Sequence, residues 1–187
     1  MVHVVKQPGR ADARRNRQAI LDAARVEFAE HGDAAQMDQI AARAGVGVGT
    51  IYRHFATKDA LLGELVDERF RAFAQDADAV AAQDGPAFER FRRMLVDNAE
   101  SIARDAGTRF AILRGGDEVW RHAEAARERL LDACRPLLDE ARADGDLRPD
   151  FRVEEIGVLM CGVCAAMDYK PEAWRRHLEI VLDGLRA

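Results

Sequence analysis

The chain has 187 residues, of which 48% are hydrophobic and 33% are charged, and its formal net charge is −5 at pH 7. This length allows one sizeable core and a small additional domain, and the negative charge argues against a general nucleic-acid coat protein. The charge is uneven, however: residues 1–60 hold 9 Lys and Arg against 7 Asp and Glu, whereas residues 61–187 hold 19 against 26. A positive amino-terminal part is the electrostatic pattern of a nucleic-acid contact.

Composition and patterning favour helices throughout. Ala, Leu, Glu and Arg are abundant, and no segment alternates in hydrophobicity for long enough to predict a sheet. The opening Val-His-Val-Val run is too short for a signal peptide, and the longest apolar run, residues 156–167, is shorter than the roughly 18 residues needed to span a membrane. We therefore expect an all-α, cytoplasmic protein without membrane contact.

Residues 1–12 are predicted to form a flexible basic arm that includes the Pro8-Gly9 break. A first helix is predicted over residues 13–31, ending before Gly32. Arginines in and after the arm could reach a phosphate or a narrow minor groove, and a solvated tail is the alternative interpretation. These arginines are Arg10, Arg14, Arg15 and Arg17.

Residues 36–58 have the pattern of two short helices joined by a tight turn. The apolar face of the first helix comprises Met37, Ile40, Ala41 and Ala44. Gly45 follows at the position where a helix end favours a left-handed residue. In the second helix, Ile51 and Phe55 point the same way because they are four residues apart.

The opposite face of this second helix carries hydrogen-bond donors beside glycines that let a backbone come close. These donors are Thr50, Tyr52, Arg53 and His54. A helix-turn-helix whose second helix enters the major groove needs this combination, whereas a hairpin buried in a core does not. Thr57 then caps the next helix, and Lys58 in its first turn is unfavourable unless an outside anion binds there.

With these residues, the sequence resembles the TetR family of bacterial transcriptional regulators over about residues 14–66. The matching residues are Ile20, Ala23, Ala24, Phe28, Ile40-Ala41, Ala44-Gly45-Val46, Gly49 to Phe55, Thr57-Lys58 and Leu61-Leu62. Two positions depart from the family: Gln36 stands where a helix-capping Thr is usual, and Gly47 where a Ser is usual. Both departures remove hydroxyl groups, so few side chains remain to read bases.

The resemblance implies a three-helix DNA-binding domain over residues 13–73, with the helix-turn-helix at about residues 36–55. It also implies a larger helical domain over residues 74–187 for effector binding and dimerisation, with about nine helices in the whole chain. The expected protein is a homodimeric repressor of a near-palindromic double-stranded operator, released by a small-molecule effector. No enzyme activity, cofactor or metal is expected.

The expected DNA contacts lie on and around the second helix of the motif. Phosphate contacts are expected from Tyr52, His54 and Lys58, and more weakly from Gln36 and Arg43. Base contacts are expected from Thr50, Arg53 and, toward a thymine methyl group, Val48, with Gly47 and Gly49 allowing close approach. Because so few donors face the bases, DNA shape should supply much of the specificity.

Beyond the motif, a long helix over residues 57–82 should connect the two domains. Further helices are predicted over residues 88–106, 108–113, 117–144 with a kink at Pro136, 153–169 and 172–185. Bulky apolar residues of these helices could line a pocket for a lipophilic effector, although each could equally belong to the core. They are Phe70, Phe73, Phe91, Met94, Phe110, Leu113, Trp120 and Met167.

The last two helices are predicted to form the dimer interface, because residues 156–167 are apolar all round and need cover on several sides. The interface residues we expect are Leu159, Gly162, Val163, Ala166, Trp174, Leu178 and Val181. A core within one chain is the alternative.

Other functions receive weaker support from the sequence. Cys161 and Cys164 have redox-motif spacing but lie in an apolar helix, so a thiol switch and a buried structural pair both stay open. Asp117, Glu118 and His122 lie close in sequence, but no nucleophile–base pair or metal motif supports an enzyme. A helical interaction module that has lost DNA binding is the remaining alternative.

Overall fold

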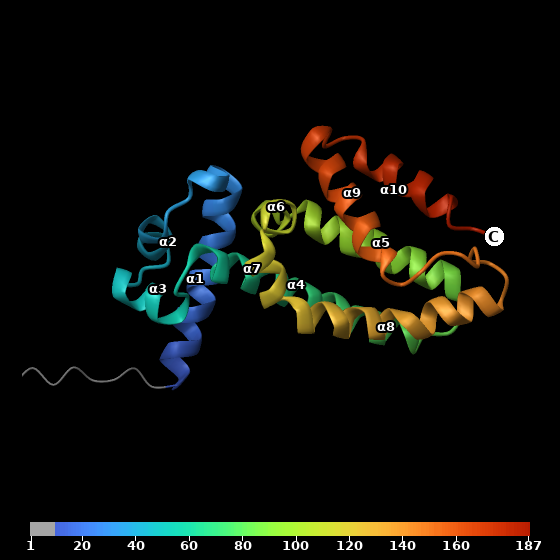
Figure 1. Cartoon of the computed structure of the whole chain (residues 1–187), viewed down its shortest axis with the longest axis horizontal. Coiled ribbons are helices and arrows are strands. Elements are labelled where there is room, and N and C mark those ends of the chain that lie inside the picture. Colours follow the sequence, from blue (N-terminus) through green and yellow to red (C-terminus); the bar gives the residue numbers. More distant parts are fainter. Residues whose placement is uncertain (1–9) are drawn as a thin grey trace, which may run out of the picture.

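A computed structural model describes residues 10–187, so most of the predicted arm, residues 1–9, lies outside the described part. Within residues 10–187 the chain forms ten α-helices, one short 3₁₀-helix and no sheet, which confirms the all-α prediction (Figure 1). The elements are α1 Arg10–His31, η1 Gly32–Ala34, α2 Met37–Arg43, α3 Val48–His54, α4 Lys58–Ala81, α5 Ala87–Ala103, α6 Ala106–Arg114, α7 Asp117–His122, α8 Glu124–Ala143, α9 Glu155–Tyr169 and α10 Trp174–Asp183. None of these helices is long and apolar enough to cross a membrane.

Helices α1, α2 and α3 form a small unit at one end of the molecule, and α4 runs from this unit into the larger helical part (Figure 1). Helix α4 packs against α5, α6, α7 and α8, and α9 packs against α5, α6 and α10. The start of α4 also contacts α1, so this one helix touches both parts of the chain. A rigid 24-residue helix of this kind can transmit a displacement between them.

Amphipathic patterning explains why these segments pack as they do. Leu61, Leu65 and Phe73 of α4 are buried at helical spacing, as are Phe88 and Phe91 of α5. Their burial joins the small unit and the larger part through one continuous hydrophobic core.

The segment predicted as one helix over residues 117–144 is two helices, and the prediction of a single helix was wrong. The break falls at the fully buried Ala123, whose φ of −91° and ψ of 2° end α7, and α8 then continues through Pro136. Helix α7 packs on α4 so closely that a Cβ atom at Gly63 would lie 2.7 Å from Cβ of His122. The chain must turn after this contact to run along α4, and no local sequence pattern marks that turn.

Candidate DNA-binding surface and ligand cavity

The turn between α2 and α3 is closed by backbone hydrogen bonds around Gly45. Gly45 has a φ of 68°, as predicted for a left-handed residue. The amide of Gly45 donates to the carbonyl of Ala42 at 3.1 Å, and that of Val46 donates to Ala41 at 3.0 Å. These two bonds satisfy carbonyls at the end of α2 and fix the direction in which α3 leaves.

Helix α3 has one buried and one exposed face. Ile51 and Phe55 point into the core, with exposed fractions of 0% and 4%. Val48 and Tyr52 are about half exposed, and Gly47, Gly49 and Arg53 are also exposed. The apolar pair therefore anchors α3 and leaves its other face toward solvent.

Two of the three residues expected to contact bases, Thr50 and Arg53, contact each other on this face of α3. The guanidinium of Arg53 donates from Nε to the Gly49 carbonyl at 2.9 Å and from a terminal nitrogen to Oγ1 of Thr50 at 3.2 Å. Arg53 is thus held along α3, and it must exchange these bonds before it can reach a base.

Gln36 and Arg43 have structural partners within the small unit. Gln36 is the N-cap of α2; its amide side chain donates to the Ala34 carbonyl at 3.0 Å, and its backbone N–H donates to Oε1 of Gln39 at 3.2 Å. Arg43 forms ion pairs at 2.6 Å with Glu27 and with Glu30, and the hydrogen bond to Glu27 is the main reason its pKa is raised. Arg43 lies at the end of α2 within the motif and connects α2 to α1.

Lys58 also has an internal partner. Its Nζ donates to the Asp33 carbonyl at 2.7 Å and lies 5.6 Å from the centre of the Phe28 ring. Oγ1 of Thr57 accepts a hydrogen bond from the Ala60 amide at 3.0 Å, as expected for an N-cap. The Asp33 carbonyl and the Phe28 ring stabilise the charge of Lys58, which would otherwise be unfavourable at a helix N-terminus. An outside anion is therefore not required to explain its position.

Helix α1 begins at Arg10. Residues 10–12 were predicted to belong to the flexible arm, and this part of the prediction was wrong because they are helical. Arg15 pairs with Asp12. Arg17 pairs with Glu64 and Glu68 of α4 and lies 5.3 Å from the centre of the Phe55 ring. The side chain of Arg10 lies outside the described part, and that of Arg14 is exposed.

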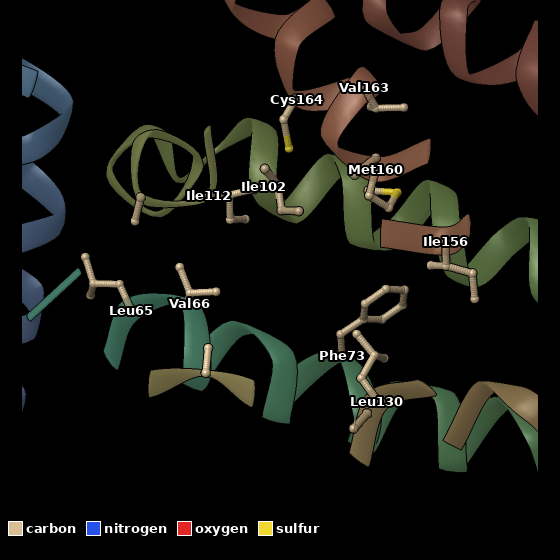
Figure 2. Close-up of a cluster of buried hydrophobic side chains, with 14 of the residues drawn as sticks. Leu65, Val66, Phe73, Ile102, Ile112, Leu130, Ile156, Met160, Val163 and Cys164 are labelled. Carbon is tan, nitrogen blue, oxygen red and sulfur yellow. The ribbon is translucent and has the colours of Figure 1, made fainter. Parts of the chain in front are cut away.

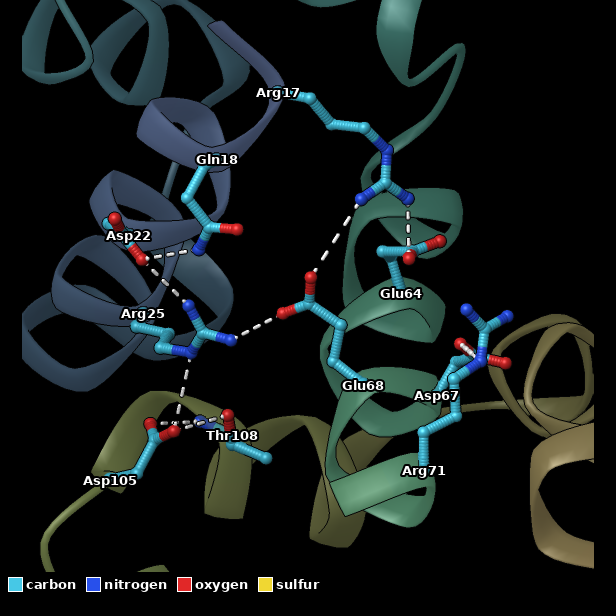
Figure 3. Close-up of polar contacts among 10 residues, drawn as sticks. All are labelled: Arg17, Gln18, Asp22, Arg25, Glu64, Asp67, Glu68, Arg71, Asp105 and Thr108. Atoms are coloured by element: carbon cyan, nitrogen blue, oxygen red, sulfur yellow. Dashed lines mark hydrogen bonds and ion pairs between the residues drawn. The ribbon is translucent and has the colours of Figure 1, made fainter. Parts of the chain in front are cut away.

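Ion pairs connect the small unit to the larger part (Figure 3). Arg25 of α1 lies 2.6 Å from a carboxylate oxygen of Glu68 on α4 and 3.4 Å from one of Asp105, the N-cap of α6. Glu64 pairs with Arg17 and with Nε2 of His122 at 3.0 Å. Burial opposes ionisation of Glu64, but the hydrogen bonds from Arg17 and His122 outweigh it and lower its pKa.

A cavity of about 730 Å³ lies between α4, α5, α6, α7, α8 and α9. Figure 2 shows Phe73 and Leu130 on one side of this space and Ile102, Ile112 and Met160 across from them. The lining residues are Arg69, Phe70, Phe73, Asn98, Ile102, Ile112, Asp117, Trp120, Arg121, Glu124, Arg127, Leu130, Leu131, Glu154, Ile156, Gly157, Val158, Met160, Cys161 and Cys164. Most of these residues are apolar, but six are charged and Asn98 is polar.

The structure brings together three of the eight expected pocket residues: Phe70, Phe73 and Trp120 line the cavity. The other five do not. Phe91, Met94 and Met167 are buried in the core, Leu113 is partly buried, and Phe110 stacks on Phe28 of α1 at 5.8 Å. Sequence reasoning missed Arg69 and Asn98, because it selected pocket residues by apolar bulk; a polar Asn98 in the apolar stripe of α5 was the available signal.

Helices α9 and α10 carry three large apolar side chains that are exposed to solvent. Val158, Tyr169 and Ile180 are 76%, 90% and 56% exposed, and Gly162 is also exposed. The seven expected interface residues divide between this surface and the interior. Val163, Trp174 and Leu178 are buried within the chain, Leu159, Ala166 and Val181 are partly buried, and Gly162 is exposed.

The cysteines are all free, and burial raises the pKa of each thiol, to about 12 for Cys134 and Cys164. Protonated thiols are poor nucleophiles, so this environment does not favour a thiol switch. Glu27, Glu30 and His31 form the one group in the described residues with metal-ligand proximity, and Arg43 already pairs with both carboxylates.

Comparison with protein families accounts for most of the chain. Residues 20–65 match the model of bacterial regulatory proteins of the TetR family, and residues 83–187 match that of the SbtR-like transcriptional regulator C-terminal domain. The HTH-type transcriptional repressor Rv3405c of Mycobacterium tuberculosis is 52% identical over 148 residues, which is 77% of this chain and 69% of that protein. The chain spans about two thirds of the length of the curated relatives it matches.

Solved structures agree with these matches. A TetR transcription regulatory protein from Mycobacterium vanbaalenii is 32% identical with a TM-score of 0.62, covering 96% of this chain and all of the other. A complex of SmeT with triclosan is 25% identical with a TM-score of 0.68, covering 90% of this chain and 88% of the other. The chain thus belongs to the TetR family of DNA-binding transcriptional regulators and is not an enzyme.

Proposed function

We propose that this chain is a homodimeric repressor that binds a near-palindromic operator and is released by a small molecule in its cavity. The observation that carries the DNA-binding part is the exposed face of α3. Its glycines and donors stand on a helix fixed by the Gly45 turn, while Ile51 and Phe55 anchor the opposite face. Such a helix can enter a major groove without rearrangement of the small unit.

Tyr52 and His54 are the proposed phosphate contacts on α3, and Lys58 at the start of α4 is a third. Arg53 and Thr50 would read base edges once they exchange their mutual hydrogen bond, and Val48 would meet a thymine methyl group. Gln36 and Arg43 hold α2 in place through their internal bonds, so their phosphate contacts would be secondary.

The outer surface of α9 and α10 supports a dimer. Val158, Gly162 and Tyr169 lie at spacings of four and seven residues and therefore on one side of α9. Isolated apolar side chains on a surface need no explanation, but a row of them on adjacent helices indicates a protein contact. Two copies packed here would form four helices and place two α3 helices about one DNA turn, roughly 34 Å, apart.

The cavity supports effector binding. Its volume of about 730 Å³ and its apolar lining suit a small lipophilic molecule. The solved complex of the similar SmeT with triclosan fits this proposal. An effector releases DNA when it binds more tightly to a dimer whose α3 helices no longer match successive grooves.

Selection of operator sequences from a random DNA pool by the purified full chain tests this proposal. We expect an enriched near-palindrome whose half-sites are about 10 base pairs apart, bound by a dimer. A folded dimer that enriches no sequence would contradict operator recognition and would favour an interaction module.

A further inference from the structure

We infer that the cavity takes an amphipathic carboxylate, with its apolar body among the helices and its carboxylate bound by Arg69 and Asn98. This inference rests on the proposed function only in treating the ligand as the effector. The binding chemistry itself follows from Arg69 and Asn98, the two polar residues of the lining that each have a buried side-chain atom without a hydrogen-bond partner within residues 10–187.

Arg69 is a partly buried cation without an anionic partner. Its terminal nitrogens donate to neutral acceptors, Oγ of Ser101 at 2.9 Å and the Asn98 carbonyl at 3.3 Å. Its Nε is buried and has no hydrogen-bond partner, and among residues 10–187 the guanidinium forms no ion pair. Burial lowers the pKa of Arg69, yet a guanidinium stays protonated at neutral pH. The positive charge in the cavity wall is therefore available to a ligand.

Two carboxylates, Asp76 and Asp105, act electrostatically on Arg69, but neither forms an ion pair with it. Asp105 receives hydrogen bonds from the backbone and hydroxyl of Thr108, and it also pairs with Arg25. Asp76 is exposed and acts on Arg69 only through space. Neither neutralises the guanidinium directly, and an unpaired charge among apolar walls favours an anionic partner.

Asn98 supplies a second unsatisfied group on the same wall. It is only 4% exposed, it lines the cavity, and its Oδ1 is buried without a hydrogen-bond partner. Rotation of the amide exchanges Oδ1 and Nδ2, so Asn98 can offer a donor in place of an acceptor. Nδ2 of Asn98 and Nε of Arg69 would then provide two donors for the two oxygens of one carboxylate.

The remaining lining selects the rest of the ligand. Ile102, Ile112, Leu130 and Met160 surround the space with apolar surface. Burial raises the pKa of both Cys161 and Cys164, so these thiols are neutral and do not repel an anion. The other charged residues of the lining are all exposed: Asp117, Arg121, Glu124, Arg127 and Glu154. A cation placed beside the part-buried Arg69 would be repelled by it, and a neutral molecule there would leave the charge of Arg69 uncompensated.

The position of Arg69 also connects this ligand to the DNA-binding unit. Arg69 follows Glu68 on α4, and Glu68 pairs with Arg25 and Arg17 of α1 (Figure 3). A carboxylate on Arg69 therefore acts on the same turn of α4 that holds α1. This is how anion binding would reach the recognition helix.

Titration calorimetry of the full chain with matched probes tests the inference. The probes are decanoate, decan-1-ol and decylammonium, and 1-naphthoate with 1-naphthylmethanol as a second, aromatic pair. We expect at least one carboxylate to bind about tenfold or more tightly than its neutral partner, and decylammonium to bind most weakly. Arg69→Met should remove this preference while leaving the affinity for the alcohols within about twofold.

Two variants separate charge recognition from altered packing. Arg69→Lys keeps the charge and should retain part of the preference, whereas Arg104→Met removes an exposed arginine at the end of α5 and should leave binding unchanged. The comparison of carboxylates with alcohols is made on the wild-type chain. It therefore tests the inference even if Arg69→Met does not fold.

The inference is overturned if neither carboxylate binds more tightly than its neutral partner, or if Arg69→Met keeps the preference. Operator binding, measured separately, distinguishes this failure from failure of the proposed function. A chain that binds its operator but shows no carboxylate preference remains a regulator with another effector. A chain that prefers carboxylates but binds no operator keeps the ligand chemistry and loses the repressor function.

Discussion

The exposed face of α3 and the wall of the cavity use arginine in opposite ways. On α3, Arg53 is exposed and its hydrogen bonds run to Gly49 and Thr50 of the same helix. In the cavity, Nε of Arg69 is buried and unsatisfied. Water can replace the bonds of the first at small free-energy cost, whereas Nε of the second has no hydrogen-bond partner within residues 10–187. Arg53 can therefore exchange its hydrogen-bond partners in solvent, whereas Nε of Arg69 is left to bind a ligand.

The largest effect is expected where the small unit meets the larger part, at the contact between α1 and α6. A Cβ atom at Gly107, at the start of α6, would lie 2.0 Å from the backbone oxygen of Arg25 on α1. Gly107→Ala should therefore force α6 away from α1 and lower the free energy of unfolding by about 3 kcal/mol, measured by urea denaturation. Gly116→Ala is the matched control, since a Cβ there meets nothing within 4 Å. Equal stability of both variants would show that the contact is not rigid.

A second experiment separates the two kinds of contact on α3. Tyr52→Ala should reduce affinity about tenfold for operator and scrambled DNA alike, because phosphate contacts carry no sequence information. Arg53→Ala should reduce the preference for operator over single-base variants by about tenfold or more. Competition binding measures both effects. If Arg53→Ala weakens all sequences equally, Arg53 is a phosphate contact.

The ion pairs between α1, α4 and α7 should make stability depend on pH. Because the pKa of Glu64 is lowered below 4.5 in the folded chain, its ionised form stabilises folding above that pH. This contribution is lost as the pH falls from 4.5 through the folded pKa. Glu64→Gln should therefore cost about 1–2 kcal/mol near pH 7, and the difference from wild type should shrink in acid. A difference that is constant from pH 7 to pH 3 would contradict this account.

The smallest effect distinguishes stability from recognition on α3. A Cβ at Gly49 meets nothing within 4 Å, and Gly49 lies inside a helix. Gly49→Ala should raise the free energy of unfolding by about 0.5–1 kcal/mol, measured by thermal denaturation. If DNA approaches the backbone there, the same variant should bind operator less tightly. Unchanged affinity would exclude a close approach at Gly49.

Short-range spacing explains why the amino-terminal motif could be predicted. Gly45, Ile51 and Phe55 lie within eleven residues, and their roles follow from local helix geometry. The cavity could not be predicted in the same way, because Arg69, Asn98 and Met160 come from three helices far apart in sequence. Bulk and hydrophobicity do not say which face of each helix meets the space, so Phe91 and Met94 were expected there although they lie in the core.

The same limit applies to the last two helices. Apolar residues all round α9 indicate that it is covered on several sides, but periodicity does not assign each side to the chain or to a partner. Trp174 and Leu178 were expected at an interface and are buried within the chain, while Val158 and Tyr169 are exposed. Only the packing of α9 and α10 on the other helices separates these two sets.

Operator affinity as a function of salt tests the central claim most directly. The enriched operator and a scrambled duplex would be titrated with the full chain at two salt concentrations. We expect the operator to bind at least about a thousandfold more tightly, with both affinities falling steeply as salt increases, at a slope of about −0.9 per phosphate neutralised. Equal affinity for the two duplexes, or binding insensitive to salt, would contradict recognition of DNA by α3.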